Sequence, residues 1–245
     1  MRRVGVITQA RAGSARLPGK VLIEVAGRTM LDHHLDRLTA AGLDVIVATT
    51  DNPDDDRVVE LVQRRGLRVF RGSEDDVLSR YAACARANEL DVVVRVTSDC
   101  PLIDGGVVAD GVTRFLRLAE EHGDDVYLSN TLERTYPRGL DFEVFGAAAL
   151  DRADREATGP SDREHVTPWL YTGPHRLTHL VQQRWLVDRS SYRVTLDTAE
   201  DLELISRLLE EHDAAALDCA GLIDVLDDHP ELVALNAEVA QREPS

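Results

Sequence analysis

The sequence predicts an α/β fold with a doubly wound, mostly parallel sheet that helices cover on both faces. Short runs of β-branched residues alternate with stretches of helical periodicity through the first half of the chain. The runs are apolar at consecutive positions, as in strands that are buried on both faces. Strands and helices that alternate in this way indicate a parallel sheet joined by right-handed crossovers.

Five strands and four helices are expected in a core that covers residues 1–133. The strands are residues 4–8, 45–49, 68–70, 92–96 and 126–128, and the helices are residues 29–41, 53–65, 75–88 and 107–122. The inward side chains are Met30, Leu31, Leu35 and Leu38 in the first helix and Val77, Leu78, Tyr81 and Ala85 in the third. Pro53 stands just inside the start of the second helix, where a missing N–H is tolerated.

The pattern changes near residue 134, and we expect an inserted smaller α+β subdomain over residues 134–190. Its elements are a strand at 140–145, helices at 150–157 and 163–171 and a polar edge strand at 177–187. Residues 191–245 are expected to return to the core, with a strand at 192–196 that rejoins the sheet and a helix at 198–211. The remaining residues are acidic and helical by pattern.

The composition is that of a globular protein with room for a full core. The chain has 245 residues and a net charge of −16 at pH 7, which disfavours nucleic acid as a partner. No apolar stretch approaches the roughly 20 residues of a membrane span, and no secretory signal is visible. We therefore expect a cytoplasmic protein without a membrane partner. The three cysteines have neither CxxC spacing nor histidine company that would suggest zinc.

The segment from Gln9 to Lys20 follows the first strand directly, the usual place for a nucleotide in a doubly wound sheet. Small residues at positions 12–14 allow backbone amides to approach phosphate oxygens closely. Arg11, Arg16 and Lys20 add positive charge within the same short reach. The segment matches neither the GxxxxGK[ST] nor the GxGxxG pattern. It indicates a polyanionic ligand, and a basic surface turn remains the alternative.

Lys20 is the only lysine of the chain, since the other 27 basic residues are arginines. A coding bias toward arginine explains the general preference. It does not explain why this one position kept an ammonium group.

Two aspartates stand at the ends of expected strands. Asp99 follows the strand at 92–96, and a carboxylate there can hold a Mg²⁺ ion that bridges phosphates, because Mg²⁺ prefers oxygen ligands. Asp197 follows the strand at 192–196. Because a helix begins directly after it, the local sequence favours Asp197 as a helix cap over Asp197 as a metal ligand.

Motifs along nearly the whole chain resemble the CMP-sugar synthetases, and most closely their SpsF-like branch. Residues 7–22 follow the pattern IxQARxGSxRLPGKVL, and further blocks are ATTDNP at 48–53, FRGSEDDVL at 70–78, TSDCPLID at 97–104, SNT at 129–131, PRGLD at 137–141, REHVTP at 163–168 and LDTAED at 196–201. The acylneuraminate and KDO cytidylyltransferases are related to this family. The family usually has WTVDTPED where this chain has VTLDTAED at 194–201, which leaves the acids in place and changes their surroundings.

The resemblance implies a cytidylyltransferase that transfers CMP from CTP to an acidic sugar or a similar acceptor, releases pyrophosphate and depends on Mg²⁺. It implies catalytic roles for Lys20, Arg11 and Asp99 and metal binding by Asp99 and Asp197. The nucleotide-binding residues that it implies are Ala10, Arg11, Gly13, Ser14, Arg16, Lys20, Ala48, Thr49, Asp51, Arg71 and Ser73. The stretch at 48–51 would line the cytosine pocket.

The same resemblance places the acceptor and a homodimer contact in residues 134–190. The residues expected to face the acceptor are Arg138, Asp141, Glu143, Arg163, Glu164 and His165, and the arginines suit an anionic acceptor such as a sugar acid or phosphonate. For 163–165 a capped, solvated helix start is an equal alternative. His165 is the candidate for a general base, although no neighbouring motif places it near an acceptor.

Two other functions remain in competition. A glycosyltransferase that uses a nucleotide sugar would share the fold, but the Asp-x-Asp motif common in that class does not follow the fourth strand. A nucleotide sensor or scaffold would typically have lost Lys20, Asp99 or Asp197, and all three are present.

Overall fold

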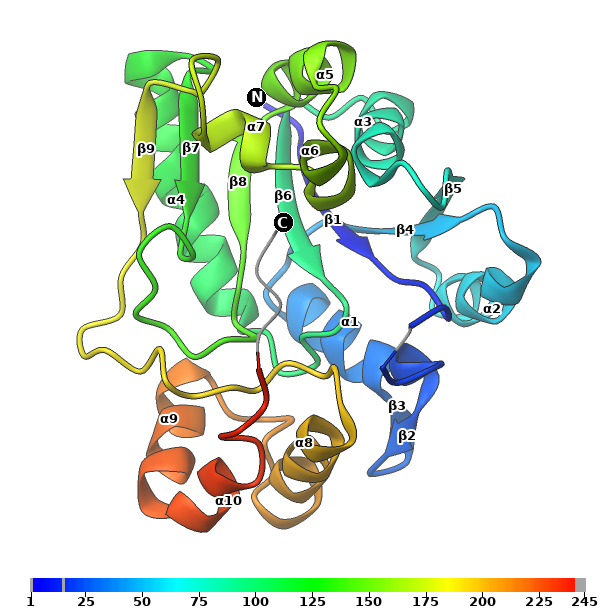
Figure 1. Cartoon of the computed structure of the whole chain (residues 1–245), viewed down its shortest axis with the longest axis vertical. Helices are drawn as coiled ribbons and strands as arrows, with labels where there is room; N and C mark the ends of the chain where they lie inside the picture. Colours follow the sequence, from blue (N-terminus) through cyan, green and yellow to red (C-terminus); the bar gives the residue numbers. More distant parts are fainter. Residues whose placement is uncertain (1, 15, 241–245) are drawn as a thin grey trace.

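A seven-stranded sheet forms the centre of the protein (Figure 1). The computed structural model describes residues 2–14 and 16–240. The strand order is β5-β4-β1-β6-β8-β7-β9, and only β8 runs against the others. The strands are β1 Val4–Gln9, β4 Val45–Thr50, β5 Arg68–Gly72, β6 Val92–Thr97, β7 Val126–Ser129, β8 Glu143–Gly146 and β9 His179–Gln182. The expected mostly parallel sheet is confirmed.

Helices cover both faces of the sheet, as the apolar runs predict. One face carries α1 Met30–Ala40, α2 Asp56–Arg64 and α4 Gly105–His122, and the other carries α3 Val77–Ala87, α5 Ala147–Glu156, α6 Pro160–His165 and α7 Pro168–Tyr171. Neighbouring strand residues alternate between the two cores, as Val6 and Ile7 show in β1. All six residues of β4 are buried. No helix among residues 2–14 and 16–240 is long and apolar enough to cross a membrane.

Residues 134–190, which we expected as an inserted subdomain, supply two strands of the central sheet. The strand β8 lies between β6 and β7, and β9 forms the edge beside β7. The helices α5 and α6, which also belong to residues 134–190, pack against α3. The expected helix at 163–171 is divided into α6 and α7, because Val166 has a left-handed φ of 73° and Pro168 begins a new helix.

The prediction that residues 192–196 rejoin the sheet is wrong. The place beside β6 is filled by β8, and the segment instead crosses the end of β6 as an extended chain. The backbone of Arg138 bonds to Tyr192 at 2.8 Å and to Val194 at 2.7 Å, and the amide of Leu196 donates to the carbonyl oxygen of Asp99 at 2.7 Å. This crossing carries the chain past Asp99 and toward Asp197.

A third core lies at one end of the molecule. The helices α8 Ala199–Glu211, α9 Cys219–Asp228 and α10 Pro230–Ala234 form this group (Figure 1). Leu204, Leu208 and Leu222 pack there with Leu196 from the crossing segment. Two short elements that the sequence did not predict, β2 Glu24–Val25 and β3 Arg28–Thr29, form a hairpin before α1.

The crossing segment is fixed by the carboxylate of Asp201 in the first turn of α8. This side chain is fully buried and accepts hydrogen bonds from the side chains of Arg193 and Asn236, each at 2.8 Å. It also accepts from the backbone amides of Asp197 and Thr198 at 2.9 and 3.1 Å. Burial alone would raise the pKa of Asp201, but the hydrogen bonds from Arg193 and Asn236 hold this pKa below its ordinary value.

An Asp201→Asn substitution is expected to lower the free energy of unfolding by about 3 kcal/mol, because it leaves the buried charge of Arg193 without its main partner. The depressed pKa stabilises the fold above about pH 4, and this contribution disappears as the pH falls through the folded-state pKa. Urea unfolding at pH 7 and pH 3 measures both effects. Asp227→Asn, which removes an exposed carboxylate bonded to Arg189, is the control. A loss as small as that of the control would contradict the assignment.

Candidate active site

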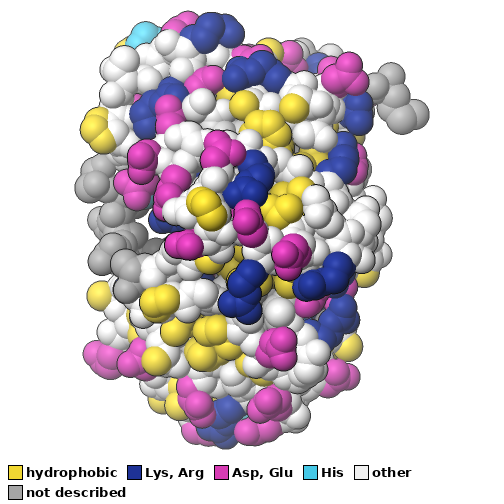
Figure 2. All heavy atoms as spheres, turned by 90° about the vertical axis from the view of Figure 1, so that its right-hand side faces the viewer, with side chains coloured by type: hydrophobic (Ala, Val, Ile, Leu, Met, Phe, Trp, Pro, Cys, Tyr) yellow, Lys and Arg dark blue, Asp and Glu magenta, His cyan; other side chains and the backbone are white. Residues whose placement is uncertain are grey.

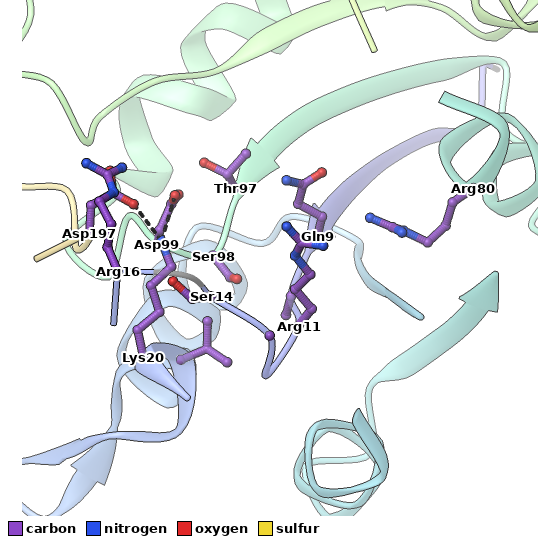
Figure 3. A pocket seen from close by; sticks show the side chains of 13 residues that line it. Gln9, Arg11, Ser14, Arg16, Lys20, Arg80, Thr97, Ser98, Asp99 and Asp197 are labelled. Atoms are coloured by element: carbon purple, nitrogen blue, oxygen red, sulfur yellow. Dashed lines mark hydrogen bonds and ion pairs between the residues drawn. The ribbon is translucent and has the colours of Figure 1, made fainter. Parts of the chain in front are cut away.

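The loop after β1 closes over a cavity of about 230 Å³ (Figure 3). The amide of Gly19 donates to the carbonyl oxygen of Ala12 at 2.9 Å, which folds the loop back on itself. Gly19 has a φ of 69°, which favours glycine at this turn. The cavity is lined by Gln9, Ala10, Arg11, Gly13, Ser14, Arg16, Lys20, Val21, Arg80, Thr97, Ser98, Asp99 and Asp197. The expected site at the carboxyl end of the first strand is therefore a real hollow.

The ammonium group of Lys20 joins three distant segments at one end of this cavity. Its Nζ donates to Asp197 Oδ1 at 2.7 Å, to the carbonyl oxygen of Leu196 at 2.8 Å and to Asp99 Oδ2 at 3.2 Å. Burial would lower the pKa of Lys20, but the two carboxylates raise it above the ordinary value. Lys20 is therefore a fixed positive charge.

The two aspartates converge as the metal-site prediction requires. Lys20 holds the pKa of Asp99 below its usual range against the opposing effect of burial. Asp197 also pairs with Arg16 at 3.1 Å and with Arg193 at 3.2 Å. Local sequence favoured Asp197 as a helix cap, but Thr198 caps α8 in a reciprocal pair with Asp201. The carboxylate of Asp197 therefore faces the cavity instead of closing the helix.

The carboxylates of Asp99 and Asp197 fit a metal ion whose remaining ligands come from the substrate and water. In the described part of the chain, no group of three or more histidine, cysteine, aspartate or glutamate side chains is placed to hold a metal by itself. Asp99 and Asp197 offer oxygen ligands close to one point, since both contact the same ammonium. Mg²⁺ is commonly held by one or two carboxylates together with phosphates and water.

Some expected nucleotide-binding residues lie outside the cavity. Ala48 and Thr49 are fully buried within β4. Asp51 is exposed, and Arg71 binds the carbonyl oxygens of Thr50 and Asn52, each at 2.9 Å. Ser73 is exposed and accepts from the amide of Asp76 at 3.0 Å, just before α3. These residues shape the strand ends beside the cavity, whereas Ala10, Arg11, Gly13, Ser14, Arg16 and Lys20 line it.

The residues expected to face the acceptor also lie outside this cavity, and most have partners of their own. Asp141 binds the guanidinium of Arg134, and the buried Glu143 binds Arg95, Tyr127 and Thr167. Arg163 binds Asp76 and Asp154. Glu164 is exposed and His165 is half-buried at the end of α6. The guanidinium of Arg138 forms no ion pair with the residues described.

Sequence reasoning missed Val21, Arg80, Thr97 and Ser98 as lining residues, and it included Gln9 only as the first residue of the predicted loop. Arg80 is only 3 % exposed and lies on α3 among inward apolar residues. A basic residue at position 80, three positions after Val77, falls on the buried face of a helix, and this pattern is a usable signal. Thr97 and Ser98 could have been found only from the end of their strand.

Comparison with known proteins shows the same family throughout the chain. The cytidylyltransferase family model matches residues 5–221. An uncharacterized protein of Methanocaldococcus jannaschii, MJ1063, is 36 % identical over 99 % of this chain and 97 % of its own length. The spore coat polysaccharide biosynthesis protein SpsF of Bacillus subtilis is 31 % identical over 92 % of this chain and 94 % of its own.

A solved structure agrees with these sequence matches. A cytidylyltransferase from Leptospira borgpetersenii superposes with a TM-score of 0.89 at 32 % identity and covers 99 % of this chain and all of its own. A CMP-KDO synthetase complexed with CTP shares the fold, with a TM-score of 0.63 at 19 % identity over 86 % of this chain and 99 % of its own. These matches show that the chain belongs to the cytidylyltransferase family of nucleotidyltransferases.

Proposed function

We propose that this enzyme transfers CMP from CTP to a small anionic acceptor, such as an acidic sugar or a phosphonate, and releases pyrophosphate. The observation that carries the proposal is the charge of the cavity. Four cationic side chains, Arg11, Arg16, Lys20 and Arg80, line it together with only two carboxylates, in a chain with a net charge of −16. A triphosphate matches this local excess of positive charge.

The reaction is an in-line displacement in which an acceptor oxygen attacks the α-phosphate and pyrophosphate leaves. The protein contributes position and charge, since phosphoryl transfer needs little covalent help. Arg11, Arg16 and the small residues of the loop hold the phosphates, and Lys20 neutralises charge that develops on the phosphoryl oxygens. Asp99 and Asp197 would hold Mg²⁺, which when bound neutralises further phosphate charge.

For the acceptor we propose a place beside Arg138. Its backbone pairs with the crossing segment that leads to Asp197, and its guanidinium is half-buried without an ion-pair partner among the residues described. Burial and the neighbouring Arg134 lower the pKa of Arg138. An acceptor carboxylate or phosphonate would compensate this charge. Asp141, Glu143, Arg163, Glu164 and His165 stay proposals for the wall of the same site.

We propose further that nucleic acid is not a partner and that the enzyme is cytoplasmic. Acidic and basic side chains are interspersed on the face shown in Figure 2. The proposal that nucleic acid is not a partner rests on the net charge of −16. Use of CTP supports the proposal of a cytoplasmic enzyme.

The substrate proposal is tested by incubating the enzyme with CTP, Mg²⁺ and a panel of acidic sugars and phosphonates while pyrophosphate is measured. Release with at least one acceptor, and its loss after chelation by EDTA, are the expected results. In thermal shift measurements CTP should stabilise the protein more than ATP, GTP or UTP. Equal shifts with all four nucleotides would contradict the cytidine assignment. Consumption of a nucleotide sugar without pyrophosphate release would favour a glycosyltransferase.

Lys20→Arg should fold and still bind CTP, but its kcat should fall by about 100-fold, the cost of losing one well-placed donor. A planar guanidinium cannot take the place of a compact ammonium among three oxygens from separate segments. Pyrophosphate release and the melting temperature measure the two effects. The control is Arg28→Lys, which exchanges the same two residue types in the opposite direction at an exposed ion pair with Asp36, outside the cavity. Full activity of Lys20→Arg would show that Lys20 supplies charge only.

We propose a homodimer whose contact includes the exposed apolar residues Leu132, Leu186 and Val187. Leu186 is 98 % exposed and Val187 54 %, and the amide of Trp185 ties this segment to Thr135 at 2.8 Å. Leu186 and Val187 are adjacent in the chain, and contiguous exposed apolar surface is a candidate contact for a second copy of the chain. Leu186→Glu should shift the protein from dimer to monomer in light scattering. A monomeric wild-type protein would contradict this contact.

A further inference from the structure

Two polar atoms in the cavity are buried and have no hydrogen-bond partner in the described part of the chain. They are Oε1 of Gln9, at the end of β1, and Nε of Arg80, on α3. Figure 3 shows the guanidinium of Arg80 pointing toward Gln9 and Arg11. Buried polar atoms without partners are costly, and when they line a hollow a ligand is the usual reason.

Arg80 is a buried cation with one edge of its guanidinium free. Its Nη1 donates to the carbonyl oxygen of Ser73, its Nε has no hydrogen-bond partner among the residues described, and the side chain lines the cavity. No carboxylate of the described residues lies within ion-pair distance. The backbone makes room for this side chain, because a Cβ at Gly72 would lie 3.1 Å from Cγ of Arg80. Burial lowers the pKa of Arg80, as expected for an uncompensated charge.

Gln9 adds a neutral amide to this end of the cavity, beside Arg11 and Arg80. Its Oε1 has no partner and the same amide carries N–H donors, so Gln9 suits a group that offers both a donor and an acceptor. The group of Lys20, Asp99, Asp197 and Arg16 lies at the opposite end, away from Arg80 (Figure 3). A nucleotide whose α-phosphate lies near Lys20 therefore extends its base toward Gln9 and Arg80.

We propose that Gln9 and Arg80 together recognise the hydrogen-bonding edge of cytosine and reject uracil. Nε and Nη2 of Arg80 donate to N3 and O2 of the base, and Oε1 of Gln9 accepts from the N4 amino group. Uracil has the same size but presents N3–H to the arginine and O4 to the glutamine oxygen. Both contacts with uracil are therefore mismatched, donor against donor and acceptor against acceptor.

This inference rests on the proposed use of CTP and adds the residues that select it. Two other roles of Arg80 give different results. If Arg80 binds a phosphate, its loss weakens every nucleoside triphosphate and inorganic triphosphate alike. If Arg80 only packs the helix, its loss lowers stability and leaves selectivity unchanged.

The experiment measures dissociation constants by calorimetry for CTP, UTP and inorganic triphosphate with the full chain. The first variant is Arg80→Lys, which keeps the positive charge but loses the two parallel N–H donors of the guanidinium. The second is Gln9→Met, which removes the amide at similar side-chain size. Each should weaken CTP binding roughly 10- to 100-fold, the value of a good bidentate base contact. Each should change UTP and triphosphate binding little, so that the preference for CTP over UTP falls. Arg86→Lys, on the same helix but paired with Asp151, is the matched control.

An unchanged ratio of CTP to UTP affinity in folded variants would overturn the inference, as would an equal loss for CTP, UTP and inorganic triphosphate. Circular dichroism and melting temperature establish folding, and Gln9→Met carries the test alone if Arg80→Lys does not fold. The outcome is separable from the proposed reaction. A wild-type protein that prefers CTP but releases no pyrophosphate contradicts the reaction, whereas a preference that survives both substitutions contradicts only the role of this pair.

Discussion

The contact of the Lys20 ammonium with two carboxylates and one carbonyl oxygen holds the proposed active site together. Asp99 lies 79 positions further along the chain, and Asp197 lies 177 positions further. Without a cation between them, two carboxylates in a half-buried cavity would repel each other. The contact therefore fixes the N-terminal loop against both aspartates.

Topology brings these groups within reach of that contact. The strands β1 and β6 are parallel neighbours, so the loop after Gln9 and the turn that holds Asp99 leave the same edge of the sheet. Asp197 arrives by the crossing segment, which passes very close to Gly139. A Cβ at Gly139, whose φ is 105°, would lie 2.6 Å from the carbonyl carbon of Val194. The carboxylate of Asp197 thus depends on a glycine that does not itself line the cavity.

The sequence predicted the parts of the fold that depend on local pattern. Apolar runs located β1, β4, β5, β6 and β7, because a strand buried on both faces has few alternatives. Residues 134–190 were expected as a separate subdomain because their pattern is irregular. The place of β8 inside the sheet and the path of residues 192–196 depend on which strand fills the position beside β6, and no local pattern encodes that choice.

The residues of the site also fall into those that the local sequence predicts and those that it does not. The basic loop residues were predictable, because small and cationic residues after a first strand have few structural uses. Asp197 was not, since its local sequence suits a helix cap and only the family resemblance favoured a metal ligand. Arg80 does not follow from the helical pattern, because that pattern identifies apolar residues on the buried face of α3. A buried charge on such a face contradicts the pattern, and that contradiction is the useful signal.

The acidity of the chain sharpens the selectivity of the cavity. Local positive charge acts over about one Debye length, roughly 8 Å at physiological salt, whereas a long polyanion also meets the negative surface beyond it. Arg11, Arg16 and Lys20 can therefore attract a triphosphate, while a net charge of −16 repels nucleic acid. A divalent ion bound to the nucleotide would reduce the charge that has to approach this surface. The same electrostatics that exclude large polyanions thus favour a small nucleotide that arrives with its metal.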